Sequence, residues 1–259
     1  MQIELDTSKT VEQNAAYYFE RAKKARKKIE GVKKALARFE IEKQNLISKK
    51  DEALKKYEKQ AAEKKKEKRT KEWYEKFRWF ISSEGFLCIG GRDATTNEIV
   101  IKKHMLKEDL VFHTEAPGSP FFVVKTSGKK VGEMTLKETA TATAIYSKAW
   151  KMGLGSARVY WIKPPQVRKE LGLPKGSFMI HGKRNYFEPV LEMAVGITEK
   201  GLVMGGPISA VKKNCTDYIE LVQGSEKKSD IAKKIKKEIG GKIDDIISVL
   251  PAGEFGIKK

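Results

Sequence analysis

The sequence predicts an α+β protein, in which a long helical coiled-coil arm is followed by a mostly antiparallel mixed sheet domain with flanking helices. Two observations lead to this class. Residues 10–72 contain no proline and a single glycine, and their apolar side chains recur at alternating steps of four and three. From Trp73 onward, short apolar runs alternate with glycine- and proline-rich turns. We expect a coiled-coil arm over residues 1–75, a globular domain over 76–200, and an extension over 201–259 that packs on this domain.

The apolar seam of the N-terminal segment predicts that its helix pairs with another one. The seam residues are Val11, Ala15, Tyr18, Ala22, Ala25, Ile29, Val32, Leu36 and Phe39. Lys43 and Lys50 interrupt the pattern further on, so two arrangements remain open. One straight helix would be about 90 Å long, and an antiparallel hairpin with its tip at the interruption would be about half as long. We expect the hairpin.

The globular part is predicted to contain short strands and a few helices. Strands are expected at residues 78–82, 86–89, 98–102, 110–113, 121–125, 157–162, within 187–197, and at 217–222. Thr135 and Glu138 have the spacing of a capping box, which predicts a helix from there to about Lys151 that ends at Gly153. Two further helices are expected at residues 229–239 and 244–250.

Composition narrows the class of partner. The chain has 53 lysines and arginines against 34 acidic residues, a formal net charge of +19, which favours a polyanionic partner, with nucleic acid first and an anionic membrane second. Cys88 and Cys215 are far apart, so a disulfide framework is not expected and a reducing compartment fits. There is no apolar run of the roughly 18 residues that a membrane span needs, and no signal-peptide pattern. We expect a cytoplasmic protein that does not bind membranes.

No enzyme signature is present. The run Gly90-Gly91-Arg92 lacks the spacing of a dinucleotide-binding loop, and Gly118-Ser119-Pro120 lacks the flanking glycines of a nucleophile elbow. The three histidines have no metal-ligand spacing. We therefore expect no cofactor, no metal and no catalytic residue. One alternative stays open, in which the fold brings Asp93 and His113 together as an acid–base pair.

The stronger signal is the clustering of cationic and polar residues with glycines, which let a backbone approach a phosphate group closely. The candidate nucleic-acid-binding residues are Arg78, Gly91, Arg92, Asn97, Lys102, Lys103, His113, Lys175, Gly176, Ser177, Gly182, Lys183, Arg184 and Asn185. Phosphate contacts are expected from Arg92, Lys102, Lys103, Lys183 and Arg184. Backbone approach is expected at Gly91, Gly176 and Gly182, and polar contacts from Asn97, His113, Ser177 and Asn185. The competing interpretation is that these clusters are ordinary exposed turns.

Several of these stretches resemble a known family. Residues 72–83 (EWYEKFRWFISS), the run GGRD at 90–93, residues 109–113 (DLVFH) and residues 176–185 (GSFMIHGKRN) resemble the NFACT-R domain (DUF814) of NEMF- and RqcH-type ribosome quality-control proteins. Residues 14–18 (NAAYY) resemble the coiled-coil segment of the same family, and the tail around Leu250-Pro251 resembles archaeal members. Val111 and His181 depart from the family pattern, where many members have an aromatic residue and an arginine.

The resemblance implies an RNA-binding module that docks on large ribosomal subunits carrying stalled, tRNA-linked nascent chains. The expected partner is ribosomal RNA of the large subunit, with tRNA and a coiled-coil protein as further partners. The family's NFACT-N part, which handles tRNA, has no counterpart in the sequence, so we do not expect an enzyme. Two rival functions are kept open. One is an RNA-processing or RNA-modifying enzyme that uses Asp93 and His113, and the other is a coiled-coil protein-interaction module.

Overall fold

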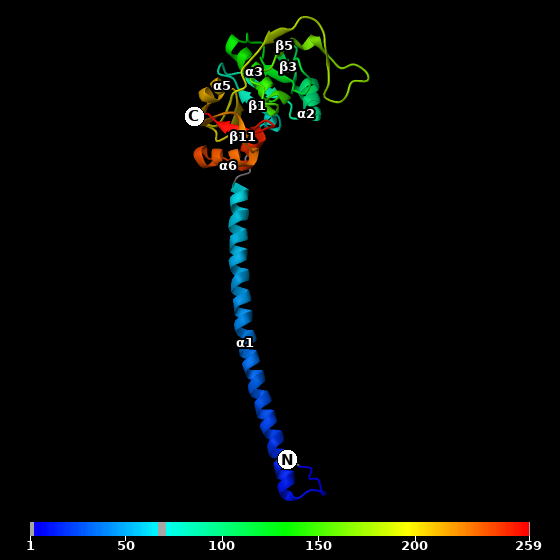
Figure 1. The fold of residues 1–259 in the computed structure, drawn as a ribbon, viewed down its shortest axis with the longest axis vertical. Coiled ribbons are helices and arrows are strands. Elements are labelled where there is room, and N and C mark those ends of the chain that lie inside the picture. The colour runs from blue at the N-terminus through cyan, green and yellow to red at the C-terminus, as the bar shows by residue number, and fades with distance from the viewer. Residues whose placement is uncertain (1–2, 67–70, 259) are drawn as a thin grey trace. The chain divides into compact units, whose positions relative to one another are not determined.

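The computed structural model describes residues 3–66 and 71–258, without the side chains of residues 48–49 and 51–66. The chain divides into two compact units, residues 1–70 and 71–259, which are drawn in Figure 1. The N-terminal unit is built on one helix, and the C-terminal unit on two sheets with flanking helices. Within the described residues, no helix combines the length and the apolar composition that crossing a membrane requires.

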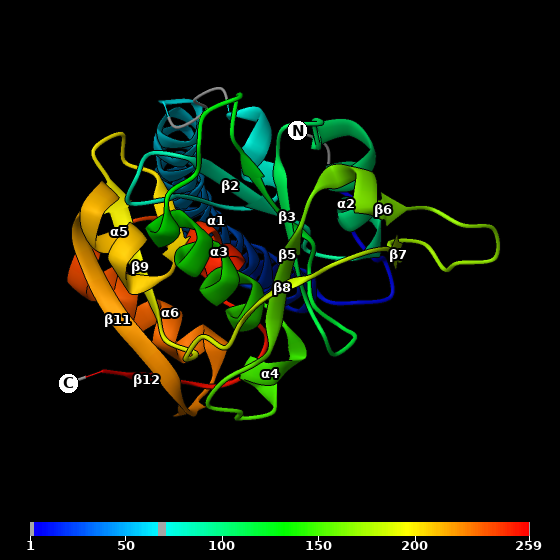
Figure 2. The same ribbon diagram turned by 90° about the horizontal axis from the view of Figure 1, so that it is seen from above.

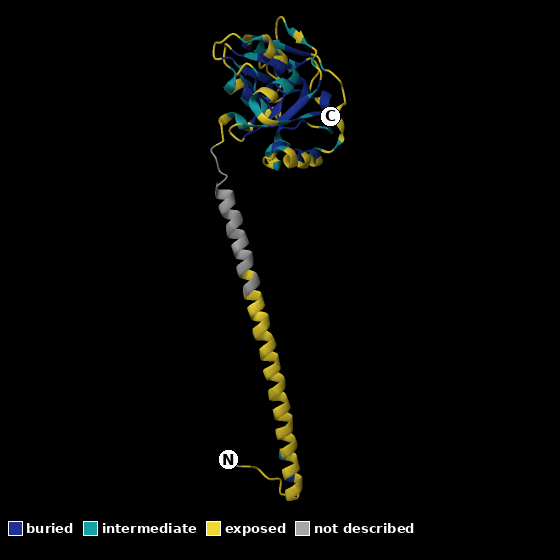
Figure 3. Ribbon diagram, turned by 90° about the vertical axis from the view of Figure 1, so that its left-hand side faces the viewer, coloured by how far each residue is buried: buried dark blue, intermediate teal, exposed yellow. Residues whose placement is uncertain are grey.

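Helix α1 (Val11–Lys66) is continuous over 56 residues. At 1.5 Å per residue this corresponds to about 84 Å. The prediction of a long helix is confirmed, but the structure does not form the predicted hairpin, because the chain does not turn back at residues 43–50. Lys43, one of the two lysines that interrupt the apolar seam, lies on the helix surface, where its Nζ is 3.8 Å from a carboxylate oxygen of Glu40. The described side chains of this helix are almost all exposed (Figure 3).

Residues 3–10 fold back against the beginning of α1. Asn14, which is 7% exposed, donates a hydrogen bond from Nδ2 to the carbonyl of Asp6 and accepts one from the Asp6 amide, both at 3.0 Å. The hydroxyl of Tyr18 donates to the carbonyl of Glu4 at 2.6 Å. Asn14 and Tyr18 of the motif at 14–18 therefore hold the N-terminal segment against the helix by hydrogen bonds.

The C-terminal unit contains two antiparallel sheets (Figure 2). The six-stranded sheet has the order β1-β2-β4-β3-β5-β8, with strands β1 (Arg78–Ile81), β2 (Leu87–Gly90), β3 (Leu110–Thr114), β4 (Phe122–Lys125), β5 (Val159–Ile162) and β8 (Asn185–Phe187). The four-stranded sheet has the order β10-β9-β11-β12, with strands β9 (Met193–Thr198), β10 (Val203–Gly206), β11 (Cys215–Glu226) and β12 (Phe255–Ile257). The predicted α+β class with antiparallel sheets is confirmed.

Helices and short elements surround these sheets. The helices are α2 (Ala94–Ile99), α3 (Glu133–Ile145), α4 (Lys148–Lys151), α5 (Ile208–Asn214), α6 (Lys228–Ile239) and α7 (Ile243–Val249), with a π-helical turn η2 (Val100–His104) after α2. The 3₁₀ turns are η1 (Trp73–Lys76) and η3 (Pro164–Gln166). Strands β6 (Val167–Arg168) and β7 (Met179–Ile180) form a separate ribbon. Figure 2 shows the long connection between these two strands projecting from the rest of the unit.

One hydrophobic core joins the two sheets. The ring centroids of Phe80 in β1 and Phe122 in β4 lie 6.3 Å apart, and both side chains are fully buried. The backbone of Gly206 in β10 lies against the side chain of Phe80. The hydroxyl of Tyr146, just after α3, hydrogen-bonds to the carbonyls of Gly205 at 3.2 Å and Val249 at 2.7 Å. These contacts place residues beyond 200 in the same unit as the six-stranded sheet.

Two local predictions are wrong. Residues 98–102 form parts of α2 and η2 rather than a strand, because Asp93 caps a helix that starts at Ala94 and accepts the Thr96 amide at 2.8 Å. Thr135 and Glu138 do not form a capping box, because α3 already begins at Glu133. Their side chains make tertiary contacts instead, and Glu138 accepts hydrogen bonds from the Ser83 amide at 2.9 Å and from Ser209.

Candidate nucleic-acid interface

Five stretches of the chain that are distant in sequence line a cavity of about 450 Å³, which we call the Arg78 cavity. Its lining residues are Arg78, Gly91, Arg92, Asp93, Ala94, Asn97, His113, Pro117, Gly118, Ser119, Pro120, Phe121, Tyr146, Lys175, Gly176, Ser177 and Phe178. Of the candidate residues, the structure brings together Arg78, Gly91, Arg92, Asn97, His113, Lys175, Gly176 and Ser177. The remaining candidates are not part of its lining.

Arg78 is the most constrained charge of the cavity. Its guanidinium lies 4.1 Å from the ring centroid of Tyr146, a distance at which the cation and the aromatic ring attract each other. Its Nη1 atom is buried and has no hydrogen-bond partner. Burial lowers the pKa of Arg78, and the neighbouring charge of Arg92 lowers it further.

Positive charge accumulates around this residue. Nη2 of Arg92 donates to the carbonyls of Glu75 at 3.2 Å and Phe77 at 3.0 Å, which anchors the side chain without neutralising it. Lys228 in α6 has its pKa lowered to about 8, first by burial and then by the charges of Arg78 and Arg92. In the part of the chain that the structure describes, no ion pair engages Arg78, Arg92 or Lys228. The three cations therefore raise the positive potential at this site, where Asp93 is the one carboxylate of the cavity lining.

Two of the three predicted glycines, Gly91 and Gly176, are required by packing. A Cβ atom on Gly91 would overlap Oδ1 of Asn97, which accepts the Phe121 amide at 3.1 Å. Gly176 has a φ of +79° and packs so closely on Ala94 that a Cβ atom would lie 2.6 Å from its Cα. Its amide donates to Glu98 at 2.8 Å, and the Gly91 amide donates to the Phe121 carbonyl at 3.3 Å. These two amides are thus engaged within the chain and are not free donors for a phosphate.

His113 and Asp93 both line the cavity, yet no hydrogen bond joins them in the described structure. Nδ1 of His113 lies 2.7 Å from the Thr114 carbonyl and donates to it when that nitrogen carries the proton. Burial lowers the pKa of His113 to about 4, although the backbone of Thr114 and Ser119 partly offsets this effect. The imidazole is therefore neutral at pH 7. The hydrogen bond from the Thr96 amide lowers the pKa of Asp93, so its carboxylate stays ionised.

The other candidate residues lie elsewhere on the unit. Lys102 forms an ion pair with Glu98 at 2.6 Å, and the same carboxylate lies 3.6 Å from Lys169. Arg184 stacks at 4.7 Å over the ring of Tyr160, the residue that pairs with His113 across β3 and β5. Lys103, Gly182 and Lys183 are exposed, and Nδ2 of Asn185 donates to the Trp161 carbonyl at 3.4 Å.

Several residues of the cavity were not predicted. Tyr146 lies under Arg78, and Phe121 and Phe178 form an edge-to-face pair with ring centroids 5.5 Å apart. Phe178 directly follows the predicted run at 175–177, so its position beside a basic, glycine-containing turn could have predicted that it lines the site. Tyr146 and Phe121 have no such signal, because each lies in an apolar or small-residue stretch whose partners are distant in sequence.

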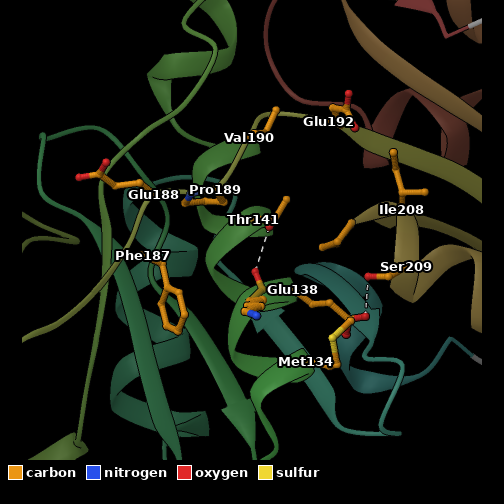
Figure 4. A pocket seen from close by; sticks show the side chains of 12 residues that line it. Met134, Glu138, Thr141, Phe187, Glu188, Pro189, Val190, Glu192, Ile208 and Ser209 are labelled. Carbon is orange, nitrogen blue, oxygen red and sulfur yellow. Dashed lines mark hydrogen bonds between the residues drawn. The ribbon is translucent and has the colours of Figure 1, made fainter.

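A second hollow of about 420 Å³ lies between α3, α5 and residues 187–192 (Figure 4). Its charged lining residues are Lys137, Glu138, Glu188 and Glu192. Acidic side chains outnumber the one lysine, which is itself paired with Glu133 at 2.8 Å. The charge of this hollow therefore disfavours a phosphate, in contrast to the Arg78 cavity.

The sequence of the globular domain is similar to that of a known domain and of several known proteins. Residues 76–182 match the NFACT protein RNA binding domain. The archaeal Rqc2 homolog aRqcH of Methanocaldococcus jannaschii is 41% identical over 207 residues, which cover 76% of this chain and 31% of that protein. The NEMF homolog of the Drosophila melanogaster ribosome quality control complex is 37% identical over 131 residues, covering 49% of this chain and 13% of that protein.

A human protein with a related name is also similar to this chain. Ribosome quality control complex subunit NEMF of Homo sapiens is 39% identical over 122 residues, covering 45% of this chain and 11% of that protein. The matched part spans less than a third of the length of each of these relatives. The resemblance predicted from the sequence is confirmed: residues 76–182 match the NFACT protein RNA binding domain, and the chain is similar to the archaeal aRqcH and to NEMF ribosome quality-control proteins.

Proposed function

We propose that this chain docks on the large ribosomal subunit through RNA, as the RNA-binding module of a cytoplasmic factor that handles stalled, tRNA-linked nascent chains. The observation that carries the proposal is the Arg78 cavity, where the three cations Arg78, Arg92 and Lys175 converge and Asp93 is the one carboxylate of the lining. Cationic groups that are not paired within a protein are available to phosphates, and their binding releases counterions from the RNA. The homology to ribosome quality-control proteins supports ribosomal RNA as the source of these phosphates.

The surrounding cations extend the proposed contact surface. Lys103 and Lys183 are exposed, and Arg184 lies over Tyr160 next to His113. We assign these three residues to phosphate contacts outside the cavity. Structured RNA is recognised mainly by the shape and position of its backbone, which suits a surface of separate cations around one polar cavity. A tRNA presents the same chemistry and is the second RNA ligand that we propose.

The seam of α1 supports a second contact, with another helix. Leu36 and Phe39 are 63% and 66% exposed, and Ile29, Val32 and Leu46 are also more than half exposed. A helix with an apolar stripe of this kind gains stability when the stripe is buried against a partner helix. We propose that α1 is one helix of a coiled coil whose other helix comes from a second copy of the chain or from a protein partner.

We propose that the chain itself carries out no catalysis. A general base has to offer a lone pair near a reacting proton and a pKa near the working pH. The pKa of His113 is far below this range, and the carboxylate of Asp93 is held by Thr96. The acid–base alternative would require cleavage or modification of purified RNA that is abolished by His113→Ala.

Co-sedimentation with purified ribosomal subunits tests the proposal. The chain is expected to pellet with large subunits and not with small subunits at low salt. The double variant Lys183→Glu/Arg184→Glu should lose most of this binding, because it reverses two charges on the proposed contact surface. The matched control Lys129→Glu, which reverses an exposed charge in the turn after β4, should bind normally. Absence of binding at low salt, or equal binding by all three proteins, would refute the docking proposal.

A further inference from the structure

The Arg78 cavity contains a hydrogen-bond donor that the chain does not satisfy. Among the described residues, Nη1 of Arg78 is the one buried side-chain nitrogen or oxygen without a partner. Buried polar groups nearly always have a partner, since an unmatched donor lowers the free energy of unfolding. The unpaired Nη1 of Arg78 belongs to a residue that lines a cavity large enough for a ligand. We infer that a bound ligand supplies the missing acceptor oxygen.

The charges around this donor favour a phosphate. Arg92 and Lys175 also line the cavity, and the buried ammonium of Lys228 is close enough for its pKa to respond to both arginines. Guanidinium groups bind phosphate oxygens with directed hydrogen bonds, and they remain charged even where burial disfavours the cation. A phosphate monoester carries nearly two negative charges and matches more of this charge than a carboxylate does. A phosphate diester carries one charge, but its oxygens accept the directed hydrogen bonds of a guanidinium.

The other polar groups favour a ligand that is more than a bare anion. The carboxylate of Asp93 lines the same cavity, and it can accept hydrogen bonds but cannot donate them. The ring of His113 is engaged by backbone groups, since its Nδ1 lies 2.7 Å from the Thr114 carbonyl and the backbone of Ser119 raises its pKa. A free phosphate would meet repulsion from Asp93. A ligand that carries hydroxyl or amino donors beside its phosphate can instead donate to this carboxylate.

The walls fit a flat ring. Phe178 lines the cavity and packs edge-to-face on Phe121, whose ring lies 4.3 Å from that of His113. The volume of about 450 Å³ is within the roughly 300–1,000 Å³ of sites that hold small organic molecules. RNA-binding proteins commonly recognise unstacked bases by packing them on aromatic side chains.

We propose that the Arg78 cavity receives one unstacked ribonucleotide, whose phosphate is bound by Arg78 and Lys175 and whose base packs against Phe178. A ribose hydroxyl or a base amino group donates a hydrogen bond to the Asp93 carboxylate. This inference rests on the proposed docking function and specifies the RNA element that the site takes. That element is a nucleotide extruded from a loop, a bulge or a single-stranded end.

Calorimetric titration of the full chain with the four nucleoside 5′-monophosphates tests the inference. At least one of them is expected to bind with one-to-one saturation. The matching nucleoside and inorganic phosphate should each bind at least tenfold more weakly. Arg78→Met should weaken binding at least tenfold, and Lys175→Met, an exposed change that leaves the core intact, should weaken it severalfold. Lys129→Met, which removes an exposed charge outside the cavity, should bind like the wild type.

Three results would overturn the inference. One is that none of the four nucleotides binds at millimolar concentration. The second is that inorganic phosphate binds as tightly as the nucleotides, which would reduce the site to an anion-binding site. The third is that Lys175→Met binds like the wild type. Parallel sedimentation with large subunits separates the two proposals, because loss of nucleotide binding with intact subunit binding contradicts only the nucleotide site.

Discussion

Asp109 and Lys125 form the most deeply buried ion pair among the described side chains. The side chain of Asp109 is fully buried, and that of Lys125 is 15% exposed. The carboxylate also accepts the Leu106 amide at 2.8 Å and the Thr126 amide at 3.0 Å, and the ammonium donates to the His104 carbonyl at 2.6 Å. This network ties the segment before β3 to the end of β4, and it gives Asp109 of the family motif a structural role.

Replacing Asp109 by Ala is expected to lower the free energy of unfolding by about 3–5 kcal/mol, because it leaves a buried ammonium without its counter-charge. Urea denaturation measures this change. The matched control is Glu133→Ala, which breaks the solvent-exposed pair with Lys137 and should change the free energy of unfolding far less. Equal effects of the two substitutions would contradict the structural role of the buried pair.

His113 makes the stability of the globular unit depend on pH. Its pKa falls from the ordinary value of 6.5 to about 4 on folding, so the unfolded chain binds more protons between these values. Its contribution to stability is therefore complete above pH 6.5 and is lost as pH falls toward 4. Between pH 7 and pH 4, the wild type should lose about 2–3 kcal/mol more than His113→Phe, which keeps an aromatic ring without a titrating group. Parallel pH dependences of the two proteins in urea denaturation would contradict this prediction.

At the scale of elements, α2 depends on its cap. The side chain of Asp93 accepts the Thr96 amide, and the Thr96 hydroxyl accepts the Asp93 amide at 2.9 Å. Asp93→Ala should lower the free energy of unfolding by about 1 kcal/mol, while Asp93→Asn, which keeps an acceptor, should cost a fraction of that. Thermal or urea denaturation distinguishes the two variants. If both cost the same, the cap does not stabilise α2.

The same element shows which parts of the fold local sequence determines. Ile99, Val100 and Ile101 are apolar and β-branched, which favours a strand when they are considered alone. The cap at Asp93 starts a helix before them, and Val100 and Ile101 are buried side by side rather than on alternate faces. Strands β1 to β5 were predictable because turns separate their apolar runs. The short strand β12 was not, because it pairs with β11 across a long connection and beyond a bulge.

Helix α1 provides a prediction about pairing. If its exposed seam binds a second helix, the isolated chain should associate through it at high concentration, and helicity should rise with concentration. Leu36→Asp/Phe39→Asp should remove this concentration dependence in sedimentation equilibrium and circular dichroism. Lys33→Asp, an exposed position outside the seam, should leave it unchanged. A wild-type chain that remains monomeric with constant helicity would contradict the proposed coiled coil.

At the scale of the whole globular unit, the sequence identified much of the cavity but not its geometry. The runs at 91–97 and 175–177 stood out because cations and glycines occur together in them, and they meet because Gly176 packs on Ala94. Arg78 was predicted as a contact residue, but its unpaired Nη1 atom was not. The surroundings of that atom depend on Tyr146, a residue nearly seventy positions away. Lys102, which was predicted to contact phosphate, is paired with Glu98, because α2 and η2 place the two residues one helical turn apart.

The salt dependence of binding to purified large ribosomal subunits tests the central claim most directly, which is that unpaired cations at the Arg78 cavity bind RNA phosphates. The affinity of the wild-type chain should fall steeply with salt, and the logarithmic slope should decrease by about 1 for each phosphate contact removed in Arg92→Gln and in Lys175→Gln. Lys129→Gln should retain the wild-type slope. Binding that is insensitive to salt, or slopes that are unchanged in the two cavity variants, would contradict the account.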